Sequence, residues 1–317
     1  MALTVVGSIA FDSVRTPFGE RDRMLGGSAV HFALAASFFA QVRVVGPVGS
    51  DFKDEHLDLL RSRDIDVADI ERVDGAETFF WRGHYEYDLN VAHTDDTRLN
   101  VFGDFEPKLS DEARSSEVLF LANIQPDLQR RVRAQCDGAR FAALDSMNLW
   151  IDTAREALLA AIHEVDCVII NDAEIRMLTG EANLARAARA VMELGPRVVI
   201  AKQGEYGAAM FTPTGFFALP GLPLEDVHDP TGAGDSFAGG FLGYLDGHAA
   251  RLPDGHLELD DQILRRAMAH GIVLASFNVE AFGTERVATL EREAIDDRLA
   301  ALREMTEFAP DGARAPN

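Results

Sequence analysis

The sequence predicts an α/β fold, in which a mostly parallel sheet is covered by helices on both faces. Two observations carry this prediction. Short runs of β-branched and other apolar residues alternate with longer helical patterns, and the alternation continues over most of the 317 residues. Hydrophobic residues also make up 47% of the chain, which suffices for one large core.

The alternation assigns the elements in chain order. The strand runs are short and rich in Val and Ile, whereas the helical segments carry apolar residues at the spacing of a helical turn. Strands are expected at residues 3–9, 42–49, 118–122, 140–144, 167–170, 197–201 and 208–211. Helices are expected at residues 27–39, 53–63, 125–135, 153–162, 173–179, 183–193, 236–245, 261–277 and 291–306.

Residues 78–105 break this rhythm, because they are aromatic and roughly alternating in character. They predict antiparallel strands outside the main layers, and residues 12–25 are expected to add strands to them. Such strands are expected to form a lid that excludes water from a site. The alternative is a hairpin at the edge of the main sheet. The tail, residues 309–317, is expected to be disordered.

Charge and composition exclude several partners. The net charge of −22, from 30 basic and 52 acidic residues, argues against nucleic acid and against an anionic membrane surface. No apolar run is long enough to span a bilayer, and the first residues lack the basic region of a signal peptide. The two cysteines, Cys136 and Cys167, fit a reducing compartment, so we expect a cytoplasmic protein.

A glycine-rich turn, Gly232-Ala233-Gly234, stands directly before Asp235 and an apolar helical pattern. A turn that opens a helix directs backbone N–H groups toward one point, and the helix dipole adds positive potential, so the site suits a phosphate. A carboxylate beside a phosphate is repelled by it. Asp235 is therefore explained best as a general base that accepts the proton of a hydroxyl attacking the phosphate. The alternative is that Asp235 only caps a buried helix.

Five segments, in matching order, resemble the ribokinase-like, or PfkB-type, carbohydrate kinases. They are GSIAFD (7–12), LGGSAVHFALAAS (25–37), NDAEIRMLTG (171–180), AKQGEYGA (201–208) and DPTGAGDSFAGGF (229–241). The resemblance implies a three-layer α/β/α sandwich with a small β-strand lid, formed by residues 1–308. It also implies that the turn, Gly232, Ala233 and Gly234, is an anion hole beside the catalytic Asp235.

The resemblance further assigns the acceptor site. Asp12, which we expect to end the first strand, would bind acceptor hydroxyls, because a carboxylate accepts two hydrogen bonds from a vicinal diol. Gly26 and Gly27 would let the acceptor approach the backbone closely. His31 stands where the family usually has Asn, and its bulk changes the pocket.

The phosphoryl donor and the metals are also assigned by resemblance. Lys202, Gly204 and Gly207 would border ATP. Asn171 and Glu174 would order waters around Mg²⁺, although N-x-x-E is also the pattern of a helix capping box. Asp229 would help to hold a monovalent cation, K⁺, beside the anion-binding turn.

The expected function is therefore an ATP-dependent kinase that phosphorylates a primary hydroxyl of a sugar. A nucleoside kinase of the same fold is the alternative, since alternation turns Phe79 and Trp81 to one face, where they could stack a base or could simply pack the lid. The resemblance also implies a homodimer formed through the lid.

Other classes fit less well. GDSFA (234–238) nearly matches the G-x-S-x-G nucleophile elbow, so a serine hydrolase using Ser236 is a further alternative. The glycine patterns of Rossmann dehydrogenases and of P-loop kinases are absent. A non-catalytic sugar-binding protein of this fold would gain nothing from Asp235 in an anion-repelling position.

Overall fold

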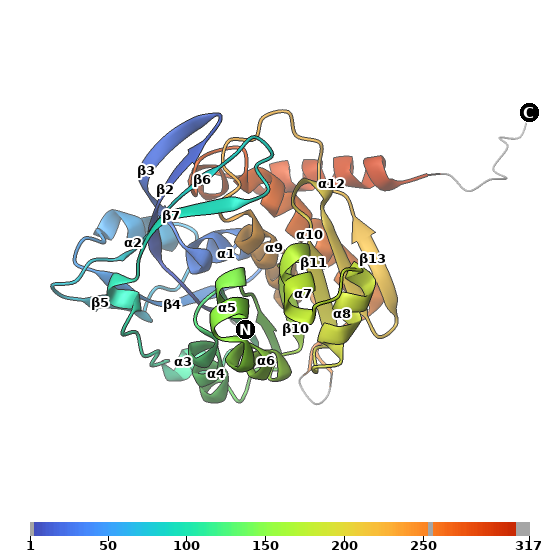
Figure 1. Ribbon diagram of the computed structural model, residues 1–317, viewed down its shortest axis with the longest axis horizontal. Coiled ribbons are helices and arrows are strands. Elements are labelled where there is room, and N and C mark those ends of the chain that lie inside the picture. Colours follow the sequence, from blue (N-terminus) through green and yellow to red (C-terminus); the bar gives the residue numbers. More distant parts are fainter. Residues whose placement is uncertain (1–2, 253–255, 309–317) are drawn as a thin grey trace, which may run out of the picture.

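A nine-stranded sheet lies at the centre of the computed structural model, which describes residues 3–252 and 256–308 (Figure 1). The strand order is β13-β12-β11-β10-β9-β8-β1-β4-β5, parallel from β5 to β11 and antiparallel at β12 and β13. The strands are β1 (Leu3–Val6), β4 (Val42–Gly49), β5 (Ile70–Val73), β8 (Val118–Leu121), β9 (Phe141–Leu144), β10 (Cys167–Asn171), β11 (Val198–Lys202), β12 (Ala208–Thr212) and β13 (Gly215–Leu219).

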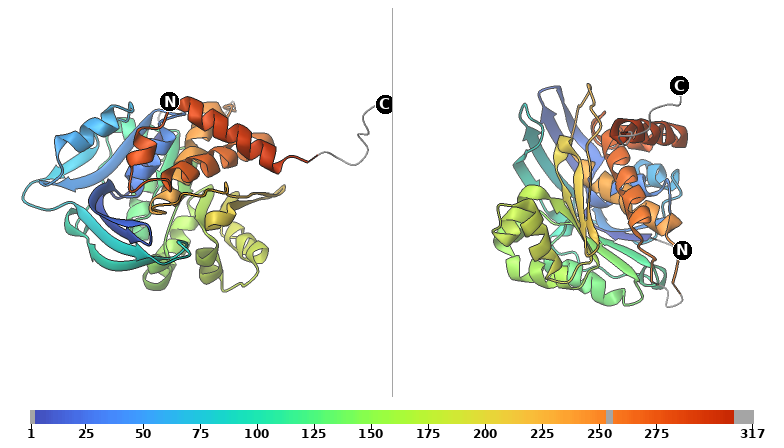
Figure 2. Two further views of the ribbon diagram at one scale, coloured as in Figure 1. Left: turned by 90° about the horizontal axis from the view of Figure 1, so that it is seen from above. Right: turned by 90° about the vertical axis from the view of Figure 1, so that its right-hand side faces the viewer.

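Helices cover both faces of this sheet (Figure 2), because successive strand residues point to opposite sides. Val5 packs into the core on one side and Val6 into the core on the other. The first layer holds α1 (Ser28–Ala36), α2 (Asp54–Arg61), α9 (Ala233–His248), α10 (Asp261–Asn278), α11 (Glu285–Ala288) and α12 (Arg292–Thr306). The second holds α3 (Asp111–Arg114), α4 (Pro126–Gln135), α5 (Asn148–Thr153), α6 (Arg155–His163), α7 (Asp172–Thr179) and α8 (Leu184–Met192). None of the helices described here has the length and apolar character needed to cross a membrane.

A second, four-stranded sheet stands beside these layers (Figure 1). Its order is β3-β2-β6-β7, from β2 (Ala10–Thr16), β3 (Gly19–Gly26), β6 (Phe79–Tyr85) and β7 (Ala92–Arg98). The segments that we expected to form a lid supply these strands. They do not extend the central sheet, so the edge-hairpin alternative is wrong.

The α/β prediction is confirmed, and two details differ from expectation. The first strand ends at Val6, so Asp12 does not end it and lies instead inside β2, in register with Met24 and Trp81. Helix α9 begins at Ala233 rather than at residue 236, which places Asp235 in its first turn. The sequence pattern also missed the short elements β5, β13, α3, α5 and α11. The expectation for residues 309–317 lies outside the described residues.

Glycines let α9 pack backbone to backbone between α1 and α10. A Cβ at Gly239 would lie 2.3 Å from the Phe32 carbonyl oxygen of α1, and one at Gly240 would lie 2.7 Å from the His270 carbonyl oxygen of α10. The run of glycines in α9 therefore serves close helix approach. This packing fixes the helix whose first turn carries Asp235.

We expect Gly239→Ala to lower the free energy of unfolding by about 1–3 kcal/mol, because the new methyl group forces α9 away from α1. Alanine's higher helix propensity acts in the opposite direction by about 1 kcal/mol, so a net loss reports the close packing. Urea denaturation measures it. The control is Gly215→Ala, where no atom lies within 4 Å of the added Cβ, and a change below about 0.5 kcal/mol is expected. A Gly239→Ala variant as stable as the parent would contradict the packing argument.

Candidate active site

Charged side chains converge at the carboxyl ends of the parallel strands, the edge where open α/β sheets bind ligands. Asp145 follows β9, Asn171 ends β10 and Lys202 ends β11. Asp235, in the first turn of α9, lies in the same region, since a Cβ at the neighbouring Gly234 would lie 2.9 Å from Nζ of Lys202. Four separate elements thus bring these residues together.

Lys202 is the cation of this cluster. Its Nζ donates a hydrogen bond to Oδ2 of Asp145 at 2.9 Å, and the Asp145 side chain is 6% exposed. Burial is the largest influence on the pKa of Lys202 and would lower it, but the carboxylates of Asp145, Glu174 and Asp235 together raise it. The ammonium group therefore stays charged. A Cβ at Gly234 would lie 2.9 Å from Nζ, so this charge also lies against the glycine-rich turn.

Asp235 does not cap α9. The N-cap residue is Gly232, at φ 77°, and no side chain makes a capping hydrogen bond there, so the capping alternative is wrong. Burial and the negative charge of Asp145 together raise the pKa of Asp235 to about 7, although the charge of Lys202 opposes the shift. A carboxyl group with this pKa can take up and release a proton near neutral pH.

The turn itself leaves donors for an anion. Ala233 donates its N–H to the Pro230 carbonyl at 3.2 Å, whereas the N–H of Gly232 has no partner among the described residues. The positive end of the 16-residue helix α9 adds to the potential at this point. Together with the ammonium group of Lys202, the turn places positive groups beside the carboxylate of Asp235.

Asp12 faces the same centre from the small sheet. Its carboxylate is buried and accepts a hydrogen bond from the Gly27 N–H at 3.3 Å. A Cβ at Gly26 would lie 2.0 Å from Oδ2, so glycine at this position makes room for the carboxylate. Burial raises the pKa of Asp12 to about 7, and the charges of Asp229 and Asp235 also raise it. Asp12 and Asp235 therefore act on one another electrostatically.

Asn171 and Glu174 form a complete capping box at the start of α7. Oδ1 of Asn171 accepts from the Glu174 N–H at 2.8 Å, and Oε2 of Glu174 accepts from the Asn171 N–H at 2.9 Å. Burial raises the pKa of Glu174 to about 7, with a further contribution from Asp145. Asn171 and Glu174 therefore do form a helix capping box, as the alternative interpretation of the N-x-x-E pattern predicts. Oε1 of Glu174 takes no part in it and can still accept a hydrogen bond from a water.

The donor set suits a hydrated divalent cation. Three carboxylates, Asp145, Glu174 and Asp235, act on the single ammonium group of Lys202, which leaves surplus negative charge. Within residues 3–252 and 256–308, no three His, Cys, Asp or Glu side chains are grouped closely enough to ligate a metal directly. Mg²⁺ commonly keeps several of its waters, so this geometry fits an ion held through water.

Asp229 is fully buried and joins two loops. Its Oδ1 accepts from the Thr231 N–H at 2.9 Å, and its Oδ2 accepts from the Gly283 N–H at 3.0 Å. The N–H of His228 also donates to the Val279 carbonyl at 2.8 Å. The segment after α10 thus lies against the turn, as expected for a shared loop site, although the K⁺ itself stays a prediction.

The small sheet contacts both sides of this centre. The Thr231 hydroxyl donates to the Tyr85 hydroxyl at 3.2 Å, which joins β6 to the turn. At the tip of the same hairpin, Asn90 donates to Glu205 at 3.4 Å. Glu205 belongs to the turn η2 (Gly204–Tyr206), between β11 and β12, which the sequence places beside the nucleotide. The small sheet therefore contacts both the glycine-rich turn and η2.

The backbone of η2 requires glycine on both sides. Gly204 has φ 57° and Gly207 has φ 92°, and a Cβ at Gly207 would lie 2.1 Å from the Leu219 carbonyl oxygen. The carboxyl end of β11 and η2 therefore form one continuous segment, which contains Lys202, Gly204 and Gly207. Their contact with ATP stays a prediction.

His31 and Ser236 lie behind the turn. His31 is 2% exposed and its Nδ1 lies 2.9 Å from Oδ1 of Asn278. Ser236 is fully buried and donates to the same Oδ1 at 2.9 Å, so it cannot serve as the exposed nucleophile of a hydrolase.

Sequence reasoning missed Asp145, Asn278 and Tyr85. Asp145 follows a strand that was predicted, so the strand-end rule could have found it. Asn278 directly follows the helix expected at residues 261–277, and Tyr85 lies in a generally aromatic segment, so neither carried a distinct signal.

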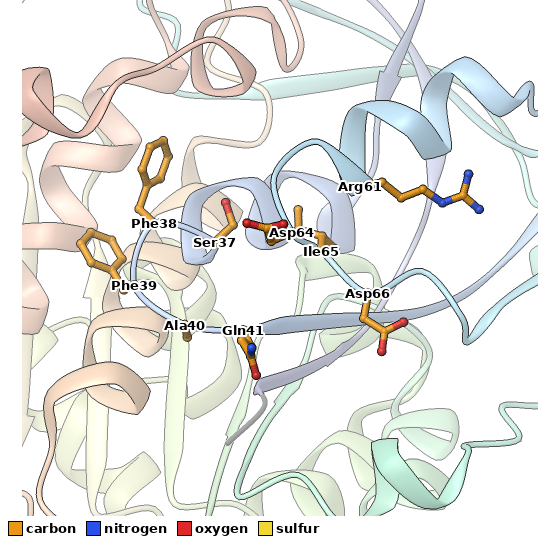
Figure 3. Close-up of a pocket in the computed structure, with 9 residues that line it drawn as sticks. All are labelled: Ser37, Phe38, Phe39, Ala40, Gln41, Arg61, Asp64, Ile65 and Asp66. Atoms are coloured by element: carbon orange, nitrogen blue, oxygen red, sulfur yellow. The ribbon is translucent and has the colours of Figure 1, made fainter.

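A surface hollow of about 710 Å³ lies away from this centre (Figure 3). Its lining includes Phe38, Phe39, Arg61 and Asp64. Gln41, which also lines it, immediately precedes β4, so the hollow lies at the amino end of that strand. It is therefore separate from the charged cluster at the carboxyl ends.

Comparison with known proteins agrees with this fold. A cytidine kinase of Thermococcus kodakarensis is 29% identical over 252 residues, covering 77% of this chain and 89% of that protein. The nucleoside kinase structure of Methanocaldococcus jannaschii superposes with a TM-score of 0.75 at 21% identity, covering 95% of this chain and 98% of that one. A candidate Ribokinase II of E. coli in complex with ATP and Mg²⁺ superposes with a TM-score of 0.76 at 16% identity, covering 96% and 99%.

The decisive match is to a family. Residues 8–289 match the family described as pfkB family carbohydrate kinase, which includes the small sheet, the charged cluster and the glycine-rich turn. The chain therefore belongs to the pfkB family of carbohydrate kinases.

Proposed function

We propose that this chain transfers the γ-phosphate of ATP to a primary hydroxyl of a sugar, with Asp235 as the general base. The observation that carries the proposal is the pairing of Asp235 with an anion-binding turn on the same helical turn of α9. A carboxylate in that position repels phosphate unless it takes up a proton during the transfer.

The raised pKa of Asp235 supports its role. The group works as the carboxylate, and a base with a pKa near the working pH combines sufficient ionisation with sufficient driving force for proton uptake. We therefore expect kcat/KM to rise as the pH increases through about 7 and to level off above it.

Donors around the turn would stabilise the transferred group. The N–H groups at the start of α9 and the Lys202 ammonium are fixed before the substrates arrive, and such preorganised donors act on the charge that develops in the transition state. Asp145 holds Lys202 in that position at 2.9 Å.

Asn171 and Glu174, supported by Asp145, would hold Mg²⁺ through its waters. When bound, Mg²⁺ supplies positive charge that neutralises the phosphates and aligns them for in-line transfer. ATP and Mg²⁺ occur together in the similar E. coli structure, which supports both as the substrate and cofactor here.

Asp12 would hold the acceptor through its hydroxyls, with Gly26 and Gly27 lining the approach. Its burial and its electrostatic interaction with Asp235 support this assignment, because the accepting hydroxyl must lie between the two carboxylates.

A nucleoside acceptor is the second candidate, and Trp81 favours it. Trp81 pairs with Asp12 in the register of β6 and β2, so both side chains lie on one face of the small sheet. The indole of Trp81 is partly exposed and lies against Gly83. Phe79 is also partly exposed, but its ring packs on Phe102 at the edge of the core. The similar cytidine kinase supports the same candidate. A thermal-shift panel of free sugars and nucleosides, with a non-hydrolysable ATP analogue, distinguishes the two.

Two further expectations remain proposals. Cys136 and Cys167 are buried free thiols, which supports a reducing, cytoplasmic compartment. Phe18 and Val91 are more than half exposed on loops of the small sheet, which supports a homodimer formed there.

Asp235→Asn should lower kcat about 100-fold or more, because the amide keeps the shape but cannot accept the proton. Nucleotide binding should survive. Steady-state kinetics measures the effect. The control is Asp152→Asn, which makes the same substitution at an exposed aspartate. Turnover of Asp235→Asn close to that of the parent would sink the general-base assignment.

Asp12→Asn should raise the acceptor KM about tenfold or more and leave the KM for MgATP unchanged, since a charge-assisted hydrogen bond to a hydroxyl is lost. Varying each substrate separately tests this. If only the MgATP parameters change, the acceptor site has been misplaced.

Glu174→Gln should raise the Mg²⁺ concentration needed for half-maximal rate, because a neutral amide attracts the hydrated ion less. Gln can still complete the capping box, so α7 should stay intact, which thermal unfolding can verify. An unchanged Mg²⁺ titration would mean that Glu174 serves only as a helix cap.

A further inference from the structure

Two buried polar residues support the glycine-rich turn from behind. His31 lies in the first layer of helices on α1, and Asn278 is the last residue of α10. They are 247 positions apart in sequence, yet Nδ1 of His31 lies 2.9 Å from Oδ1 of Asn278. Both are buried, at 2% and 0% exposure. No role in substrate binding explains Asn278.

The hydrogen bonds of Asn278 determine which atom of His31 carries its proton. Nδ2 of Asn278 donates to the Thr231 carbonyl at 2.7 Å, and a carbonyl can only accept, so the amide orientation is fixed. Oδ1 then accepts from the Ser236 hydroxyl and from His31. His31 must therefore carry its hydrogen on Nδ1. Burial lowers the pKa of His31, which keeps the ring neutral.

The imidazole ring also packs directly on the turn. A Cβ at Gly232 would lie 2.3 Å from Cγ of the ring, and Gly232 itself has φ 77°. Nε2 is buried and has no hydrogen-bond partner among the described residues, so the ring offers no exposed polar atom to a ligand. The ring contacts Gly232, and its amide partner holds the carbonyl of Thr231, the preceding residue.

We propose that His31 and Asn278 are positioning residues, which fix the Thr231–Gly234 turn so that the Gly232 N–H, unpartnered within the described part of the chain, points at the transferred phosphate. This inference rests on the proposed function and gives His31 a different task from the acceptor binding that its sequence position implies. The Thr231 carbonyl, held by Asn278, sets the orientation of the peptide unit that carries the Gly232 N–H. A shift of about 1 Å in such donors can cost about 100-fold in rate.

Four variants test the pair. His31→Phe keeps a ring against Gly232 and removes the donor, His31→Asn keeps an amide donor, Asn278→Ala removes all three hydrogen bonds, and the double variant combines His31→Phe with Asn278→Ala. The matched control is His270→Phe, because His270 is also a buried histidine on a helix of the same layer but lies outside the site.

We expect His31→Phe and Asn278→Ala each to lower kcat about 10- to 100-fold, with both KM values changed by less than about threefold. The double variant should lose little more than either single variant, because the two residues act as one unit. His31→Asn should recover most of the rate. His270→Phe should keep the parental kcat in its folded fraction.

Three results would overturn the inference. A rise in acceptor KM with unchanged kcat in His31→Phe would make His31 an acceptor ligand. A loss of thermal stability without a loss of kcat would make the pair merely structural. A crystal structure of Asn278→Ala, which needs no substrate, should show the Thr231–Gly234 turn displaced, and an unmoved turn would also contradict the inference. Failure of the parent protein to phosphorylate any acceptor would instead refute the proposed function, while the crystal structure still tests the positioning role.

Discussion

The partly buried ammonium group of Lys202 is the charge on which the rest of the site depends. It is hydrogen-bonded to Asp145 and lies in the field of Glu174 and Asp235, so three carboxylates share one cation. Removing that cation would leave buried negative charges without compensation, which is costly in a protein interior. The surplus negative charge also creates the demand for further positive groups, namely the amino end of α9 and a hydrated divalent cation.

Burial and the crowding of carboxylates around Lys202 explain the raised pKa values of Asp235 and Glu174. Asp235 and Glu174 both have a pKa of about 7, because burial disfavours their charged forms and Asp145 adds repulsion. The folded state therefore binds protons more tightly than the unfolded chain, in which these groups titrate near pH 4. Their contribution to stability declines as the pH rises from about 4 to about 7. Near pH 7 these carboxylates therefore contribute less to the free energy of unfolding than they do at lower pH. The burial of apolar side chains in the two hydrophobic cores offsets this loss.

The sequence predicted the layers, and it predicted several residues that the structure brings together at the candidate site, because both depend on local patterns. Alternating apolar runs identified the central strands, and the glycine-rich turn before α9 identified Asp235. The sequence pattern could not predict which residues far apart in the chain become neighbours in the fold. Asp12 was expected at the end of the first strand, since no local signal separates β1 from β2, and its true neighbours come from β3 and β6. Asn278 was missed because its three partners lie on elements that only the fold brings together.

The most direct test of this account is a crystal structure with a non-hydrolysable ATP analogue, Mg²⁺ and an acceptor. The account predicts the terminal phosphate at the Thr231–Gly234 turn, within hydrogen-bonding distance of the Gly232 N–H and of the Lys202 ammonium. The acceptor's primary hydroxyl should lie between that phosphate and the carboxylate of Asp235. A complex in which the phosphates bind elsewhere, with Asp235 facing neither substrate, would contradict it.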